Sequence, residues 1–264
     1  MARPVVALLT DFGTRDHYAG TLKGVVLSVC PDVTLVDIGH EIPAHDVVAG
    51  ALELAACYRY FPHGTIFLVV VDPGVGSARR GIAADIGDYR FVAPDNGVLS
   101  AVFHESPPKK VVELTERKYS RPTISRTFEG RDRFAPAAGF LAKGVPLVSL
   151  GKTITNYQSI ELACPVVTAA QLSGEVVRVD RFGNLISNID RKAFEHFANG
   201  AAIAVVAGDR DVPRIVATYA DAPVGELCAL FGSTDHLEIA INAGDAAASL
   251  QLGRGAAVRV RLVR

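Results

Sequence analysis

The chain has 264 residues, and 49% of them are apolar, which is enough for one large domain or two smaller ones around a sizeable core. Its 27 basic and 28 acidic residues leave a formal net charge of −1 without a basic stripe, so we expect no nucleic-acid partner. No apolar run approaches the roughly 18 residues that span a membrane, and four scattered cysteines fit neither a zinc site nor a disulfide framework, so we expect a cytoplasmic protein.

The first half of the chain alternates short apolar strands with helices. Strands are predicted over residues 5–9, 33–38 and 66–72, and helices over 18–30 and 47–60, the second capped by Asp46. This order is typical of an α/β domain with a mixed, mostly parallel sheet and flanking helices. A hairpin (82–86 and 90–93), a short helix (98–103), a strand (111–114) and a helix (133–143, capped by Asp132) are expected to follow.

The segment Ile66–Arg80 organises this first domain. Its apolar run predicts a strand buried on both faces, ending at Asp72, where open α/β sheets place their ligand crevice. Gly74 and Gly76 turn the chain sharply, so that Arg79 folds back toward Asp72. Such an Asp–Arg pair is either a salt bridge that only pins the turn or part of a ligand site, and the residues alone leave both open.

Polar residues also gather at two other places in this domain. Asp11 and Asp16 follow the first strand; Asp16 could simply cap the next helix, or the two carboxylates could bind a metal or grip hydroxyl and amino groups. The run Thr127–Asp132 leads into a helix, where ligand contact is favoured. Alternatively, this run only caps the helix, and Arg131 forms a surface ion pair with a neighbour.

The second half of the chain changes to short strands separated by Gly and Asp turns. Strands are predicted over residues 175–179, 185–189, 202–206, 214–218, 226–230, 237–241 and 257–263. This pattern predicts a small β-barrel. The expected organisation is an α/β domain over 1–160, a linker over 161–172 and a barrel domain over 173–264. Taken alone, the turns at 180–184 and 232–235 are ordinary.

Seven motifs, in order and with compatible spacing, together resemble one family. They are TDFG (10–13), HYAGTLKGV (17–25), VDPGVGSARR (71–80), APDNG (93–97), TFEGRD (127–132), FGN (182–184) and LEIAIN (237–242). The chain is similar along essentially its whole length to the S-adenosyl-L-methionine hydroxide adenosyltransferases, which are related to the fluorinase and chlorinase. The resemblance implies an α/β domain joined to a β-barrel, and a homotrimer whose substrate sites lie between subunits. It implies no cofactor and no metal.

The resemblance also implies how the substrate S-adenosyl-L-methionine is bound. Asp11 would hold the ribose hydroxyls, since a carboxylate accepts two hydrogen bonds. Asp16 and Asp180 would accept from the methionine amino group. The remaining positions would contact the carboxylate (Ser233 and Thr234), wall the ribose and adenine (Phe128 and Phe182), and read the base edge (Asn184 and the backbone around Asn242).

The implied reaction is an SN2 displacement at ribose C5′ by water, releasing adenosine and methionine. Asp72 and Arg79 match two members of the family's Asp–Arg–His set, which is thought to position and activate the water. The sulfonium needs no leaving-group acid, so the catalytic demand falls on orienting the water and accepting its proton. The halide-using relatives have an aromatic residue at the position of Asp72, so its presence favours water as the nucleophile.

One position departs from the family pattern. The third member of the set is usually His, in TFHGRD, whereas this chain has Glu129. If Asp72 and Glu129 are both ionised, one arginine faces two negative charges, which favours sulfonium binding but opposes hydroxide formation. Glu129 either carries a proton during the reaction, the hypothesis we adopt, or draws Arg79 away and slows it.

Three other functions remain to be weighed against the hydrolase. A non-catalytic module that binds S-adenosyl-L-methionine or adenosine would follow if the Glu129 change abolished the chemistry. A halide-dependent adenosyltransferase is disfavoured by Asp72. A metal-dependent hydrolase would be built on Asp11, Asp16, His17 and Asp72.

Overall fold

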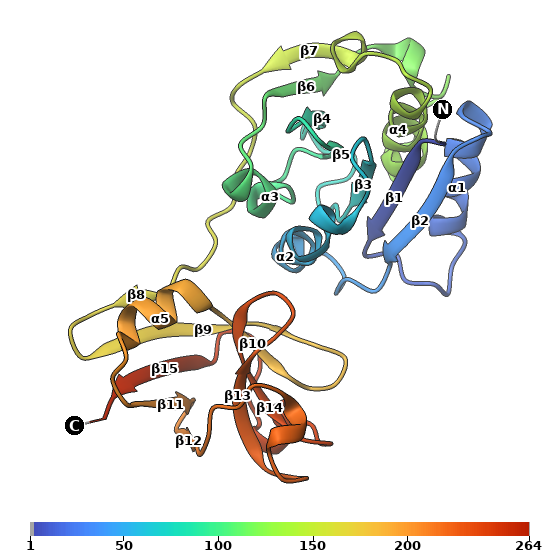
Figure 1. Ribbon diagram of the computed structural model, residues 1–264. Coiled ribbons are helices and arrows are strands. Elements are labelled where there is room, and N and C mark those ends of the chain that lie inside the picture. The colour runs from blue at the N-terminus through green and yellow to red at the C-terminus, as the bar shows by residue number, and fades with distance from the viewer. Residues whose placement is uncertain (1–2, 264) are drawn as a thin grey trace. The chain divides into compact units, whose positions relative to one another are not determined.

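The computed structural model describes residues 3–263. The chain forms two compact units, Met1–Glu161 and Leu162–Arg264, each with its own hydrophobic core (Figure 1). We call them the N-terminal and C-terminal units. The two predicted classes, an α/β domain followed by a barrel, are both confirmed. Residues 162–172 lie in the C-terminal unit.

The N-terminal unit contains a seven-stranded mixed sheet with the order β2-β1-β3-β5-β4-β6-β7. The strands β2, β1, β3 and β5 run parallel, and β4, β6 and β7 pair antiparallel. The predicted hairpin is therefore confirmed as β4 and β5. The strands are β1 (Val5–Thr10), β2 (Thr34–Gly39), β3 (Ile66–Val70), β4 (Gly81–Asp85), β5 (Arg90–Pro94), β6 (Lys110–Leu114) and β7 (Gly151–Ile154).

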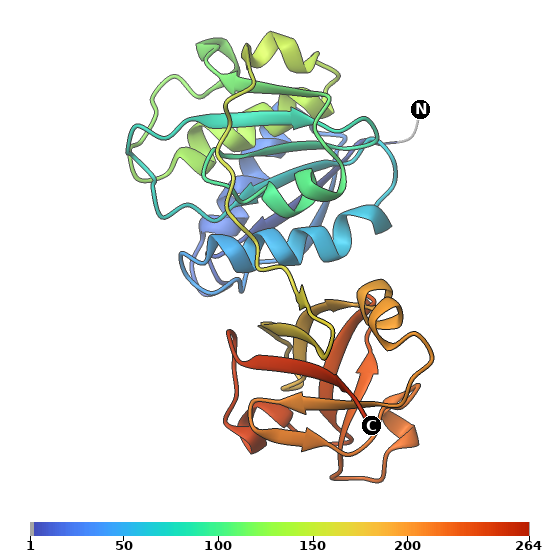
Figure 2. The same ribbon diagram turned by 90° about the vertical axis from the view of Figure 1, so that its left-hand side faces the viewer.

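Helices cover both faces of this sheet (Figures 1 and 2). They are α1 (Tyr18–Val29) and α4 (Ala135–Ala142) on one face, and α2 (Val47–Cys57) and α3 (Ser100–Glu105) on the other. Short helical turns lie at η1 (Tyr58–Tyr60), η2 (Arg117–Tyr119), η3 (Gly130–Phe134) and η4 (Leu147–Leu150). No helix in residues 3–263 combines the length and the apolar character that crossing a membrane requires.

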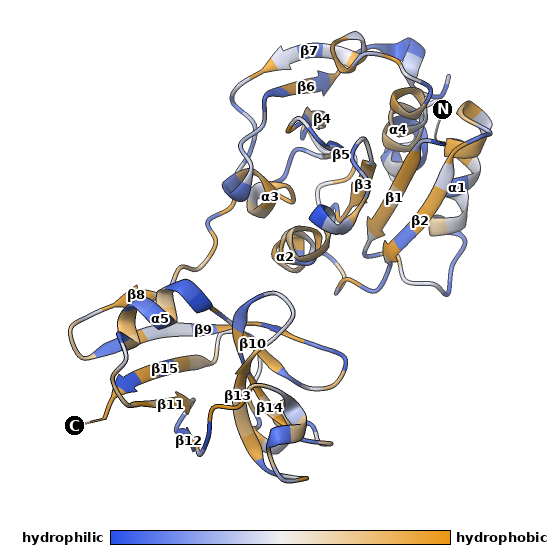
Figure 3. Ribbon diagram, in the orientation of Figure 1, coloured by the Kyte–Doolittle hydropathy of each residue, from blue (hydrophilic) through white to orange (hydrophobic). Residues whose placement is uncertain are grey.

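The central strand β3 is buried on both faces, as its apolar run predicted. Ile66, Leu68 and Val70 belong to the core beneath α1 and α4. Phe67 and Val69 belong to the core beneath α2, because successive side chains of a strand point to opposite faces. Figure 3 accordingly shows β1 and β3 mostly in hydrophobic colours. Because both faces of β3 are covered, only the residues at its ends can place polar groups in a ligand site.

The C-terminal unit is an antiparallel sheet with the order β12-β11-β15-β9-β10-β14-β13, with β8 paired to β9. Its end strands β12 and β13 lie close together, so the sheet nearly closes into a barrel. The strands are β8 (Val166–Val167), β9 (Gln171–Val179), β10 (Leu185–Asp190), β11 (Ile203–Ala207), β12 (Arg210–Val212), β13 (Leu227–Phe231), β14 (His236–Ile241) and β15 (Ala257–Leu262). Helices α5 (Arg191–Ala198), α6 (Ala246–Leu250) and the turn η5 (Tyr219–Asp221) complete it.

Two local predictions in the C-terminal unit are wrong. The strand expected over 214–218 is reduced to an isolated bridge between Ile215 and Ala229. The chain then leaves the sheet, because Thr218 and Asp221 cap the turn η5 reciprocally. Helix α5 was not predicted; Asp190 caps it by accepting a hydrogen bond from the amide of Ala193.

The helix caps were predicted with mixed success. Asp46 caps α2, accepting from the amide of Ala49 at 2.9 Å, as expected. Asp16 does not cap α1, whose N-cap position is His17. Asp132 is also not a cap, because it lies inside the π-helical turn η3, fully buried and paired with Arg131. A π-helical turn inserts an extra residue, which no 3.6-residue periodicity reveals.

We predict that Gly76 is required for the loop after β3 to pack. Its φ is +76°, and a Cβ there would lie 2.2 Å from the carbonyl oxygen of Arg126. Gly64 is a matched control, with φ +87° and nothing within 4 Å of a Cβ. Gly64→Ala should cost about 1–2 kcal/mol of unfolding free energy from the left-handed backbone alone, and Gly76→Ala about 1–3 kcal/mol more from the clash. Urea denaturation of both variants measures the difference; equal losses would refute the close approach.

Candidate active site

Asp11 and Asp72 leave the sheet side by side. The strands β1 and β3 are parallel neighbours, with Thr10 paired to Val70. Asp11 follows Thr10 directly, and Asp72 comes two residues after Val70. Both carboxylates therefore emerge at the carboxyl edge of the sheet, where α/β proteins bind their ligands.

Arg79 joins two carboxylates that are far apart in the sequence. Its Nε donates to Oδ1 of Asp72 at 2.9 Å, and its Nη2 donates to Oδ2 of the same carboxylate. Its Nη1 donates to Oε2 of Glu129 at 2.7 Å. None of the three side chains is more than 10% exposed. The guanidinium also lies over the ring of Phe134, so the cluster is held in one geometry.

Burial raises the pKa of the Asp72 carboxyl above its ordinary value, because the hydrogen bonds from Arg79 only partly replace the lost water. The negative charge of Glu129 acts in the same direction. Burial lowers the pKa of Arg79, but the two carboxylates more than offset this and hold it above its usual range. Asp72 thus has a raised proton affinity beside a partner that stays charged.

A second guanidinium holds Glu129 from another side. Arg133 Nη1 donates to Oε2 of Glu129 at 3.1 Å, and its Nη2 donates to the carbonyl of Leu114, at the end of β6, at 3.0 Å. Sequence reasoning missed Arg133. The available signal was its spacing of four residues from Glu129 on a helical segment, at which side chains can pair.

A cavity of about 570 Å³ opens beside this cluster in the N-terminal unit. Asp11, Asp72 and Glu129 line it together with Phe128. Phe128 forms an aromatic group with Phe12 and Tyr18, at centroid distances of 5.1 to 5.9 Å. Tyr18, His45 and Val75, to which the sequence analysis gave no role, also line it, as do His17 and Arg131, which were named there in other roles.

Two of the expected residues of this unit stand apart from the cavity wall. Asp16 is exposed and is not among the lining residues. Arg79 is not among the lining residues either, but it is bonded to Asp72 and Glu129, which are. Asp11 does line the cavity, and one of its oxygens accepts from the amide of His45 at 2.9 Å. Its other oxygen can still accept from a ligand.

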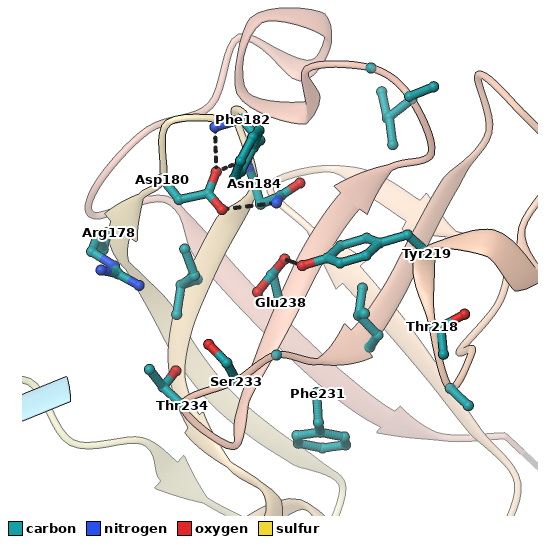
Figure 4. A pocket seen from close by; sticks show the side chains of 17 residues that line it. Arg178, Asp180, Phe182, Asn184, Thr218, Tyr219, Phe231, Ser233, Thr234 and Glu238 are labelled. Carbon is teal, nitrogen blue, oxygen red and sulfur yellow. Dashed lines mark hydrogen bonds between the residues drawn. The ribbon is translucent and has the colours of Figure 1, made fainter. Parts of the chain in front are cut away.

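A second cavity, of about 860 Å³, lies in the C-terminal unit (Figure 4). Asp180 organises its rim, accepting from the amides of Phe182 and Asn184 and from the Asn184 side chain, each at 2.9 Å. Phe182 is left 75% exposed, an unusual position for a large aromatic ring. Ser233 and Thr234 line the same cavity from the turn before β14.

Asn242 is placed differently from the other expected residues of this unit. Its neighbours Ile241 and Ala243 line the cavity, whereas its own side chain donates to the carbonyl of Ala222 at 2.7 Å. Asn242 itself is not among the lining residues.

Sequence reasoning missed a polar pair in the second cavity, formed by the buried Glu238 and the partly exposed Tyr219. Tyr219 Oη donates to Oε1 of Glu238 at 2.5 Å, and Figure 4 shows the two side chains pointing toward one another. Burial raises the pKa of both groups. Glu238 lies within the LEIAIN motif, but the sequence predicted it only as one residue of a strand. Tyr219 carries no motif.

The expected residues therefore fall into two groups, one around each cavity. Within residues 3–263, no set of three or more His, Cys, Asp or Glu side chains is arranged to hold a metal ion. The four residues considered for such a site, among them Asp11 and Asp72, accordingly do not form a metal-ligand group.

The fold and these cavities define a two-domain protein that presents carboxylates and aromatic rings to a small molecule. Two family models match it, the SAM hydroxide adenosyltransferase N-terminal domain over residues 6–151 and the corresponding C-terminal domain over residues 174–259. The chain belongs to the SAM hydroxide adenosyltransferase family.

Several relatives match along nearly the whole chain. An (R)-S-adenosyl-L-methionine hydrolase from Thermus thermophilus is 37% identical, covering 98% of this chain and 99% of the relative. A fluorinase from an Actinoplanes species is 31% identical, covering 97% of each. The crystal structure of an uncharacterized conserved protein from Thermotoga maritima has a TM-score of 0.92 at 35% identity, covering 97% of this chain and 99% of that one.

We predict that Tyr219→Phe destabilises the protein in a pH-dependent way. Above the raised pKa of Glu238, the variant leaves a buried carboxylate without its donor, which should cost about 1–3 kcal/mol of unfolding free energy. The loss should shrink as the pH falls through that pKa, because protonated Glu238 no longer needs the donor. Tyr60→Phe is the control, since Tyr60 is 80% exposed. Equal effects of the two variants in urea denaturation would contradict the prediction.

Proposed function

We propose that this protein hydrolyses S-adenosyl-L-methionine to adenosine and L-methionine. The observation that carries the proposal is Asp72, which lines the cavity and is hydrogen-bonded to Arg79. The relatives named (R)-S-adenosyl-L-methionine hydrolase support it at 34–37% identity over nearly the whole chain. The wide spacing of the cysteines fits a reducing cytoplasm as the location.

The chemistry is a displacement in which a water oxygen bonds to ribose C5′ while the C5′–S bond breaks. The bonding pair goes to sulfur, which leaves as the neutral thioether of methionine, and the water proton passes to a carboxylate. Asp72 can serve as that acceptor, because its carboxylate has about four lone-pair sites and accepts two hydrogen bonds from Arg79 and one from the amide of Gly74. Arg79 stabilises hydroxide character developing nearby. Orientation of the water supplies the rest.

Substrate contacts are proposed in both cavities. In the N-terminal unit, Asp11 accepts from the ribose hydroxyls and Phe128 walls the sugar. In the C-terminal unit, Asp180 and Asn184 face the amino group and the base edge, with Phe182 as a stacking surface. Ser233 and Thr234 meet the methionine carboxylate.

Two of the proposed contacts have less support than the others. Asp16 lies outside the first cavity, and the Asn242 side chain is already bonded to Ala222. A homotrimer with sites between subunits would bring the two kinds of cavity together. The exposed ring of Phe182 supports this arrangement, since such a surface gains from being covered.

The decisive experiment is incubation of the purified, chelator-treated protein with S-adenosyl-L-methionine in heavy-oxygen water. We expect adenosine that carries the heavy oxygen at C5′, detected by mass spectrometry, with chelation leaving the rate unchanged. Substrate that binds but returns intact would favour the non-catalytic module. Loss of activity on chelation, restored by a divalent metal, would favour the metal-dependent hydrolase, and a halide requirement would favour the halide-dependent enzyme.

We predict that Asp72 sets the acid limb of the pH–rate profile. The carboxylate must be ionised to accept the proton, so kcat should fall as the pH drops through its pKa. Because burial raises that pKa, the fall should begin at a higher pH than for an ordinary aspartate of about 3.9. Asp72→Asn should lower kcat by about 10²- to 10⁴-fold and remove this limb. Asp88→Asn, on an exposed turn, should change neither. An unchanged limb in Asp72→Asn would assign the proton acceptor to another group.

A further inference from the structure

Arg133 is a charged group bonded to the Asp72–Arg79–Glu129 cluster to which the proposed mechanism gives no role. It is 19% exposed, and its guanidinium is fixed at both ends of its fork, by Glu129 Oε2 at 3.1 Å and by the carbonyl of Leu114 at 3.0 Å. The Leu114 carbonyl belongs to the end of β6, so the sheet itself sets where Arg133 points.

The charges of this cluster balance only when Arg133 is counted. Asp72 and Glu129 bring two negative charges, and Arg79 and Arg133 bring two positive charges. Without Arg133, one guanidinium would serve two carboxylates that are at least 90% buried. Buried charges are tolerated when they are paired and strongly destabilising when one partner is missing.

The hydrogen bonds show how the balance works. Arg79 donates to Asp72 through Nε and Nη2, and to Glu129 only through Nη1. The same Glu129 oxygen receives Arg133 Nη1, so two guanidinium groups share its charge. Loss of Arg133 would leave Glu129 to compete with Asp72 for Arg79, and would leave a net negative charge beside the position where hydroxide character develops.

We propose that Arg133 is a positioning residue: it neutralises Glu129 and so keeps Arg79 hydrogen-bonded to Asp72. Glu129 and Arg133 act as a coupled unit: the carboxylate at 129 is compatible with catalysis because the arginine four residues later offsets it. Arg133 is therefore needed only while residue 129 carries a negative charge. This inference rests on the proposed hydrolase function and concerns the same site.

A double-substitution cycle tests this coupling through release of adenosine. Arg133→Leu in the wild-type background should lower kcat by about tenfold or more, the scale of one uncompensated charge near the reacting atoms, with KM changed less than twofold. In a Glu129→Gln background, the same substitution should change kcat by less than twofold. A role of Arg133 in folding alone would also be relieved by Glu129→Gln, but it would not lower kcat per folded molecule, so the rate is normalised to the folded fraction of each variant.

The chain offers a matched control in Arg121. It also pairs with a buried carboxylate in this region, Asp132, at 3.3 Å, but it has no bond to Glu129. Arg121→Leu should have the same effect whether residue 129 is Glu or Gln. If Arg133→Leu does not fold, Arg133→Gln removes the charge while keeping a donor for the Leu114 carbonyl, and the same results are expected.

The outcomes separate this inference from the function on which it rests. Adenosine release by the wild type, with equal effects of Arg133→Leu in both backgrounds, overturns the inference and leaves the hydrolase intact. No adenosine release by the wild type overturns the hydrolase. The cycle is then measured on the urea midpoint of unfolding, where equal shifts in both backgrounds overturn the pairing of Glu129 with Arg133.

Discussion

The geometry of the N-terminal cavity depends on the guanidinium of Arg79. It ties the loop after β3 to the segment that opens α4, because Asp72 and Glu129 both bond to it. The tie is buried, with Phe134 beneath it, so water does not compete for these hydrogen bonds. A buried ionic tie must be nearly neutral to persist, and this requirement extends the cluster to Arg133.

The same tie explains how one carboxylate can serve both structure and chemistry. Asp72 is oriented by two hydrogen bonds from one rigid fork, and it also lines the cavity. Burial raises its proton affinity without removing its positive partner. A group with these properties can hold a water molecule and accept its proton, and no acid is needed for a leaving sulfonium.

The C-terminal unit holds the carboxylates of its cavity with neutral hydrogen-bond donors instead of the Arg79 guanidinium. The Asp180 carboxylate accepts hydrogen bonds from Phe182 and Asn184, so the turn that carries these two residues is rigid before any ligand binds. Glu238 accepts a hydrogen bond from Tyr219 in the same cavity. Both pairs place oriented polar groups in a cavity that also has apolar walls, among them Ile186, Leu230 and Phe231, which suits recognition of an amphipathic small molecule.

The sequence by itself determined the two fold classes, the buried strand β3 with Asp72 at its end, and the family. These follow from local patterns: runs of apolar residues, glycine turns and motifs that are contiguous in the chain. It also indicated that Arg79 returns to Asp72, because only seven residues separate them. It did not reveal the π-helical turn around Asp132, helix α5, or the turn that ends the short pairing at Ile215.

Only the tertiary structure decided which distant groups share a charge or a hydrogen bond. Arg79 meets Glu129 across 50 positions, Tyr219 meets Glu238 across two different elements, and Arg133 reaches back to β6. Burial then sets the proton affinity of Asp72, and burial is a property of the packed core rather than of any motif. The substitution at position 129 could be found in the sequence, but the arginine that offsets it emerged only once the chain was folded.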